Sequence, residues 1–96
     1  MIKGTAMQPD SLKLFDPAAL VASPPPGSVN VRVGRVVEGP GGKWVPCATK
    51  VAAGVYYSSL FQVGPGQRQV CLADVSMPCA EMALSRAIEL ANAAAS

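Results

Sequence analysis

Residues 29–37 alternate between valine and polar side chains, which is the pattern of a β-strand with one buried face. The segment reads VNVRVGRVV, with valines at positions 29, 31 and 33 and polar residues between them. Gly34 lies where this alternation slips, and a glycine at such a point is typical of a β-bulge. The pattern therefore predicts a first strand over residues 29–37.

Three further segments are rich in β-branched or aromatic residues and predict three more strands. They read KWVPCAT at 43–49, GVYYSSLFQV at 54–63 and RQVCLADV at 68–75. Pro46 suits a sheet edge or the end of the second strand, because it cannot donate a backbone hydrogen bond. Tyr56 and Tyr57 are adjacent in the third strand and must point to opposite faces, so we expect one in the core and one exposed.

Residues 76–96 change to a helical period. Ser76 is a suitable N-cap, and Pro78 is tolerated in a first helical turn. At 100° per residue, the polar side chains gather on one side and the apolar ones on the other, with alanine at the centre of the apolar face. Met82 is apolar but lies on the polar side beside Arg86, which makes it a candidate contact residue.

These elements predict an α+β fold. We expect a four-stranded antiparallel meander with the C-terminal helix packed across one face, a two-layer sandwich. Residues 28–96 form this single domain, and residues 1–27 form a proline-rich N-terminal arm or linker with five prolines. Within the arm, Asp16 before Pro17 predicts a short helix over 17–21, and the prolines at 24–26 favour an extended spacer. Two alternatives remain for the arm: a poorly ordered tail, or a segment that packs in a groove.

Two glycine-rich stretches match one another. EGPGGKWV at 38–45 aligns with VGPGQRQV at 63–70, so that Lys43 corresponds to Arg68. A Pro-Gly pair suits a type II turn, with the glycine at positive φ, and both stretches separate strand-like segments. We therefore interpret them as two hairpin corners. A phosphate-binding loop is excluded, because Val37 and Trp44 occupy positions that such a loop gives to glycine and to serine or threonine.

Composition argues against more classes of function than any motif does. The 96 residues include no histidine, so the usual proton-transfer residue and any Cys–His pair are missing. The three cysteines, Cys47, Cys71 and Cys79, have no common zinc-ligand spacing and are expected to be small apolar residues. We expect no enzyme activity, no catalytic residues, no metal and no cofactor. No apolar run is long enough to span a bilayer and no secretory signal is evident, so we expect a cytoplasmic protein without membrane association.

These observations favour a small binding protein that acts through a protein interface, as an inhibitor or adaptor. Its size and lack of catalytic groups suggest the hypothesis of an origin in a phage or mobile element. Tyr, Trp, Met and Arg are the residue types that anchor interfaces. The candidate partner-binding residues are Arg32, Arg35, Lys43, Trp44, Tyr56, Tyr57, Arg68 and Met82. Trp44 has a second interpretation, as a residue that covers one end of the core.

Nucleic-acid binding is the alternative function. Residues 28–75 carry five cations against two carboxylates, a net charge of +3, and the open face of the sheet would present them to phosphates. These cations are Arg32, Arg35, Lys43, Lys50 and Arg68. Self-association is a third alternative, because an unpaired edge strand could pair across a homodimer.

Overall fold

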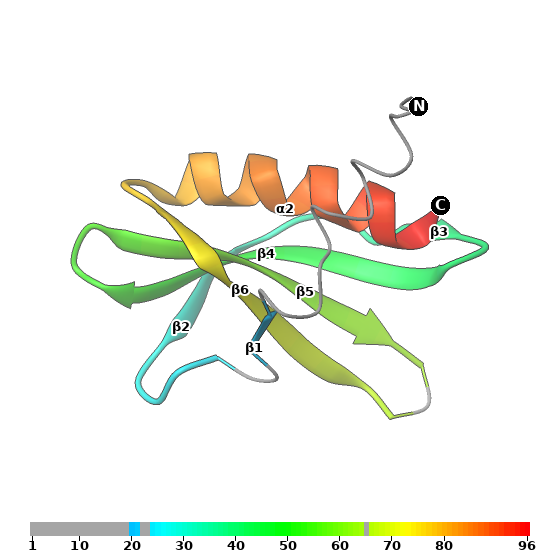
Figure 1. The fold of residues 1–96 in the computed structure, drawn as a ribbon, viewed down its shortest axis with the longest axis horizontal. Helices are drawn as coiled ribbons and strands as arrows, with labels where there is room; N and C mark the ends of the chain where they lie inside the picture. The colour runs from blue at the N-terminus through cyan, green and yellow to red at the C-terminus, as the bar shows by residue number, and fades with distance from the viewer. Residues whose placement is uncertain (1–19, 22–23, 65) are drawn as a thin grey trace, which may run out of the picture.

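The computed structural model describes residues 20–21, 24–64 and 66–96 of the chain. Within them, six strands form one antiparallel sheet, and helix α2 (Ala80–Ala95) lies across one face of it (Figure 1). The strands are β1 (Leu20–Val21), β2 (Val29–Val33), β3 (Val37–Gly39), β4 (Gly42–Ala52), β5 (Val55–Val63) and β6 (Arg68–Met77). The predicted α+β arrangement of antiparallel strands with a C-terminal helix is confirmed, although the described strands outnumber the predicted four.

The centre of the sheet is the meander β4–β5–β6, which the sequence predicted from three of its strand-like segments. The strand order is β1-β6-β5-β4-β2, and β3 also pairs with β4. Strands β2 and β3 share the same outer side of β4 and follow one another along it. The predicted first strand over 29–37 is therefore two short strands with a break between them.

Pro46 explains this break. It lies in the middle of β4, opposite Leu60 of β5, and not at an edge or at a strand end as the sequence suggested. Its carbonyl oxygen accepts a hydrogen bond from the backbone N–H of Gly34 (2.8 Å), so the backbone polar groups of Pro46 point toward β2 and β3. Because proline has no N–H to donate on that side, the ladder is interrupted there while pairing with β5 continues.

Helix α2 begins at Ala80, later than the sequence predicted. Strand β6 continues to Met77, and Ser76 pairs with Tyr57 of β5, so Ser76 is not the N-cap. The N-cap is Cys79, which makes no side-chain capping bond. Glu81 in the first turn interacts favourably with the positive end of the helix dipole.

The core lies between α2 and the sheet. It comprises Trp44, Leu60, Leu72, Ala87, Leu90, Ala91 and Ala95. The alanine-centred helix face is confirmed. Ile88 remains 39 % exposed, because the buried face turns toward Ala83 and Leu90. Ser58 of β5 forms a hydrogen bond with the helix, because its buried hydroxyl donates to the carbonyl oxygen of Ala83 (2.7 Å).

The hairpin between β3 and β4 packs against the C-terminal end of α2. The backbone N–H of Gly41 donates to the carbonyl oxygen of Ala95 over 2.8 Å, and a Cβ at Gly41 would overlap with the carbonyl of Ala94. The positive φ of this corner is at Gly42 (113°), and not at Gly41 as a type II turn would require. At the matching corner, Gly66 does have a positive φ of 71° after the proline, as predicted.

The predicted N-terminal arm lies mostly outside the described residues, and its two alternatives remain predictions. Two parts of it can be compared with the structure. Leu20 and Val21 form β1, paired with Leu72 and Cys71 of β6, and are not the end of a short helix. The proline run ends in a turn closed by the Ser28 N–H and the Pro25 carbonyl (3.2 Å), so it is not an extended spacer throughout.

Candidate functional site

The sheet curls away from the helix. Asn30 of β2 and Gln69 of β6 are hydrogen-bonded through their side chains (2.9 Å from Gln69 Nε2 to Asn30 Oδ1), although β4 and β5 lie between them in the strand order. Three steps between flat strands would separate them by about 14 Å, so the face opposite α2 is concave. Figure 1 shows β2 and the first half of β6 extending away from α2.

The concave face holds a polar cluster whose centre is buried. Thr49 donates to Asn30 (2.8 Å) and shares a hydrogen bond with Ser59 (2.7 Å), to which Gln69 also donates (2.7 Å). Thr49 and Ser59 are fully buried, and each of the four side chains has at least two partners within the cluster. Their hydrogen-bonding capacity is used in tying β2 to β6, so this cluster is structural and is not our candidate site.

Two thiols flank Ser59 on the same face. Cys47 and Cys71 stand opposite Ser59 in the neighbouring strands, and both are buried. Burial raises the pKa of the Cys47 thiol, and the neighbouring Cys71 raises it further, while the hydrogen bond with Ser59 opposes the rise. Burial also raises the pKa of Cys71, against hydrogen bonds with Thr49 and Ser59. A buried thiol that stays protonated is a poor nucleophile and a poor metal ligand.

The helix side of the sheet is different, because α2 leaves one end of it uncovered. The register places Lys50, Tyr56 and Met77 side by side across β4, β5 and β6, just beyond the first turn of α2. Tyr56 and Met77 are half-buried and Lys50 is exposed. This row therefore presents an aromatic ring, a thioether and a cation on one accessible surface.

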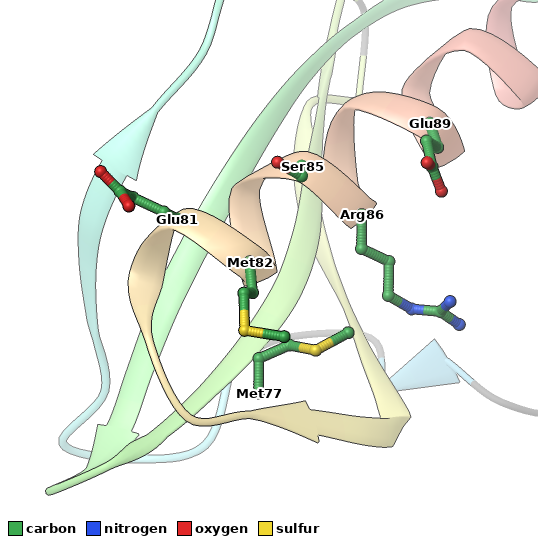
Figure 2. A pocket seen from close by; sticks show the side chains of 6 residues that line it. All are labelled: Met77, Glu81, Met82, Ser85, Arg86 and Glu89. Atoms are coloured by element: carbon green, nitrogen blue, oxygen red, sulfur yellow. The ribbon is translucent and has the colours of Figure 1, made fainter.

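Met77 connects the row to a groove along the outer face of α2. The groove has a volume of about 380 Å³ and is lined by Met77, Glu81, Met82, Ser85, Arg86 and Glu89. Figure 2 shows the side chains of Met77 and Met82 turned toward one another, with Arg86 and Glu81 directed to opposite sides of them. Tyr56 and Met82 are far apart in sequence, but Met77 joins them. We define the row and the groove together as the Tyr56–Met82 surface.

The predicted cations do not share one face. Lys43 and Lys50 are seven residues apart in a regular part of β4, so their side chains point to opposite faces. Lys43 forms an ion pair with Glu38 (3.8 Å), and both side chains are exposed.

The cations of the two matching corners also lie on opposite faces of the sheet. Arg68 is opposite Gln62 of β5, whereas Lys43 is opposite the next residue, Val63. Gln62 and Val63 are adjacent in β5 and therefore point to opposite faces. Arg32 is opposite Ala48, on the helix side with Lys50, and Arg35 is exposed beyond the end of β2.

The aromatic candidates occupy three different places. Trp44 is in the core, 8 % exposed, and its indole Nε1 donates to the carbonyl oxygen of Gly41 (3.1 Å), so it covers one end of the core. Tyr57 is on the concave face opposite Thr49, and Tyr56 is on the helix side. Both tyrosines are half-buried, which corrects the expectation of one core and one exposed ring.

Sequence reasoning missed Met77, because it assigned residues 76–79 to the start of the helix. A signal was present, since Val75 and Met77 alternate with Asp74 and Ser76 and extend the period of the fourth strand. Gln69 and Asn30 were also missed as partners. No local pattern predicts a hydrogen bond between residues 39 positions apart, because it depends on the curl of the whole sheet.

Within the described residues, no group of three or more Cys, Asp or Glu side chains is arranged to hold a metal ion, and no helix is long and apolar enough to cross a membrane. No protein-family model, no curated protein and no solved structure matches this chain.

Proposed function

We propose that this chain is a non-catalytic binding protein of inhibitor or adaptor type, which binds a partner protein through the Tyr56–Met82 surface. The observation that carries the proposal is the assembly of Tyr56, Met77 and Met82 on one accessible surface. Met82 is 50 % exposed although it is a large apolar residue. Such residues are costly to leave in water and are typical of surfaces that a partner covers.

The chemistry of this surface suits a protein partner. Methionine side chains are unbranched and polarizable, so they adapt to the shape of an incoming apolar group. Tyrosine combines a large apolar ring with a hydroxyl that can keep a hydrogen bond at the edge of an interface. Glu81, Ser85 and Glu89 form a polar rim along the same helix, which matches the general anatomy of interfaces.

The proposal is tested by affinity capture from the native host with nuclease-treated lysate. Met82→Glu places a charge in the groove, so we expect the captured protein partner to be lost. Ile88→Glu is the matched control, because Ile88 is also an exposed apolar residue of α2 but does not line the groove. We expect this control to retain the partner.

Two outcomes would count against the proposal. Equal capture by both variants would show that the groove is not the contact surface. Capture that disappears with nuclease treatment would instead support the alternative function, nucleic-acid binding, which also predicts a steep loss of binding as salt rises.

A further inference from the structure

Strand β2 ends the sheet on one side. It is the last strand in the pairing order, and it pairs only with β4 among the described strands. An unpaired edge offers a row of backbone N–H and C=O groups that another extended chain can use. Proteins usually protect such an edge with prolines, charges or a covering segment.

The side chains of β2 are unusually apolar for an exposed edge. All five of its residues are exposed, and Val29 and Val33 have 59 % and 62 % of their surface in contact with solvent. Val36, just beyond the strand, is 53 % exposed. Valine favours extended structure and apolar contacts, so these residues are suited to pack against an added strand.

Three cations surround this edge. Arg32 lies in β2, Lys50 is opposite Val29 in β4, and Arg35 follows the strand. The ion pair that the described residues form, Lys43 with Glu38, lies at the other end of β4. Among the carboxylates whose side chains the structure describes, none pairs with these three cations. The described part of the edge is therefore positively charged.

A second copy of the chain fits this edge poorly. A two-fold antiparallel pair centred on Val31 would place Val29 opposite Val33 of the other copy, and residues opposite one another must share a face. The bulge between Asn30 and Arg32 prevents this, because Val29 is on the helix side with Lys50 while Val33 is on the concave side with Cys47. Self-pairing would also bring six cations together, which costs free energy.

We propose that β2 is a strand-addition site for an extended, acidic segment of a partner protein. The segment would pair with the free backbone edge, lay apolar side chains on the exposed valines and direct carboxylates toward Arg32 and Lys50. This inference rests on the proposed function of protein binding, and it assigns the class of partner and a second part of the contact. Nucleic acid is less well matched, because β2 itself carries no aromatic side chain on which a base could stack.

The experiment is a selection of ten-residue peptides from a random display library on the intact chain. We expect the enriched peptides to be acidic and depleted in proline relative to the starting library. A synthetic copy of one enriched peptide is then titrated by fluorescence anisotropy. Arg32→Glu with Lys50→Glu should weaken binding by about tenfold or more. Arg68→Glu is the matched control, with the same change of charge per residue at the distant β5–β6 end, and should change affinity little.

Strand addition has a signature in the peptide itself. Only alternate N–H groups of an added strand face the edge, so N-methylation at one set of alternate positions should abolish binding, while methylation at the other set should preserve it. If methylation of the two alternate sets of positions affected binding equally, the proposal would be overturned. Enriched peptides that are neutral or basic, an absence of enrichment, or binding that the double charge reversal leaves unchanged would also overturn it.

Two further measurements separate the alternatives. Retention of a single-stranded oligonucleotide that depends on Arg32 and Lys50, with no acidic peptide bound, would assign the edge to nucleic acid. A mass that rises with concentration in light scattering and is lost in the same double variant would assign it to a second copy. Either result would overturn the proposal. Met82→Glu should not affect peptide binding at β2, so failure at this edge is distinguishable from failure of the Tyr56–Met82 surface.

Discussion

The backbone N–H of Gly41 donates to the carbonyl oxygen of Ala95 over 2.8 Å, so the hairpin between β3 and β4 caps the end of the terminal helix. The last carbonyls of a helix have no partner within the helix, and this contact supplies one. The GPGGK stretch resembles a phosphate loop in composition, but its glycines allow a backbone to approach a helix end. Its lysine takes part in an exposed ion pair with Glu38.

Gly41→Ala should destabilise the chain by about 2–4 kcal/mol, because the added Cβ would overlap with the Ala94 carbonyl and displace the hydrogen bond to Ala95. Urea denaturation followed by circular dichroism measures this free energy of unfolding. Gly54→Ala is the control: its φ of 72° is unfavourable for alanine, but a Cβ there meets no atom within 4 Å. We expect that control to cost only about 1 kcal/mol. Equal losses would mean that the helix end is not held by this corner.

The curl of the sheet should depend on the bond between Asn30 and Gln69. Gln69→Ala removes donors to Asn30 and to the buried Ser59, so we expect a loss of about 1–3 kcal/mol in the free energy of unfolding. A double-mutant cycle with Asn30→Ala isolates the pair, and we expect a coupling energy of about 0.5 kcal/mol or more. Additive losses from the two single variants would indicate that β2 and β6 are held together by other contacts.

The two buried thiols should make stability fall at alkaline pH. Their pKa is raised by folding, so the unfolded chain loses these protons first as pH rises. Their contribution is complete below the unfolded pKa and is lost as pH rises above about 9, through the folded pKa. Denaturation midpoints across this range should decline less steeply in a Cys47→Ala, Cys71→Ala double variant. Parallel declines in the two proteins would contradict the assignment of this pH dependence to the two buried thiols.

Thiol labelling at neutral pH should separate the three cysteines. Cys79 is exposed at the start of α2, whereas Cys47 and Cys71 are buried. We expect an aromatic disulfide reagent to modify one thiol per chain rapidly and the other two only on unfolding. Cys79→Ser should remove the rapid phase. A rapid phase that persists in this variant would show that the concave face opens to solvent in the native state.

Ser58→Ala should loosen α2 from the sheet. The Ser58 hydroxyl is buried and donates to the Ala83 carbonyl, so we expect a loss of about 1 kcal/mol in the free energy of unfolding. Ser85→Ala is the control, because Ser85 is exposed on the same helix. It should change stability by less than about 0.5 kcal/mol. A loss at Ser85 as large as that at Ser58 would contradict this role for the buried hydrogen bond.

Part of the proposed binding surface could be predicted from the sequence. Tyr56 and Met82 were candidates because of their residue types, and the structure joins them through Met77. Trp44 was a candidate for the same reason but lies in the core. Residue type alone does not indicate which face of a strand is covered. The cations were predicted as one group, but their separation depends on strand register and on a bulge that opposes one residue of β4 to two of β2.

The local elements followed from the periods of apolar residues, since strand and helix each impose a fixed spacing on the side chains that must leave water. The sequence therefore predicted the order of strand, hairpin and helix, the alanine face of α2 and the two glycine corners. The tertiary structure decided the rest. The split of the first strand depends on where Pro46 meets Gly34, and the concave face depends on Asn30 reaching Gln69. These contacts join residues that are distant in the chain, so only the folded sheet brings their atoms together.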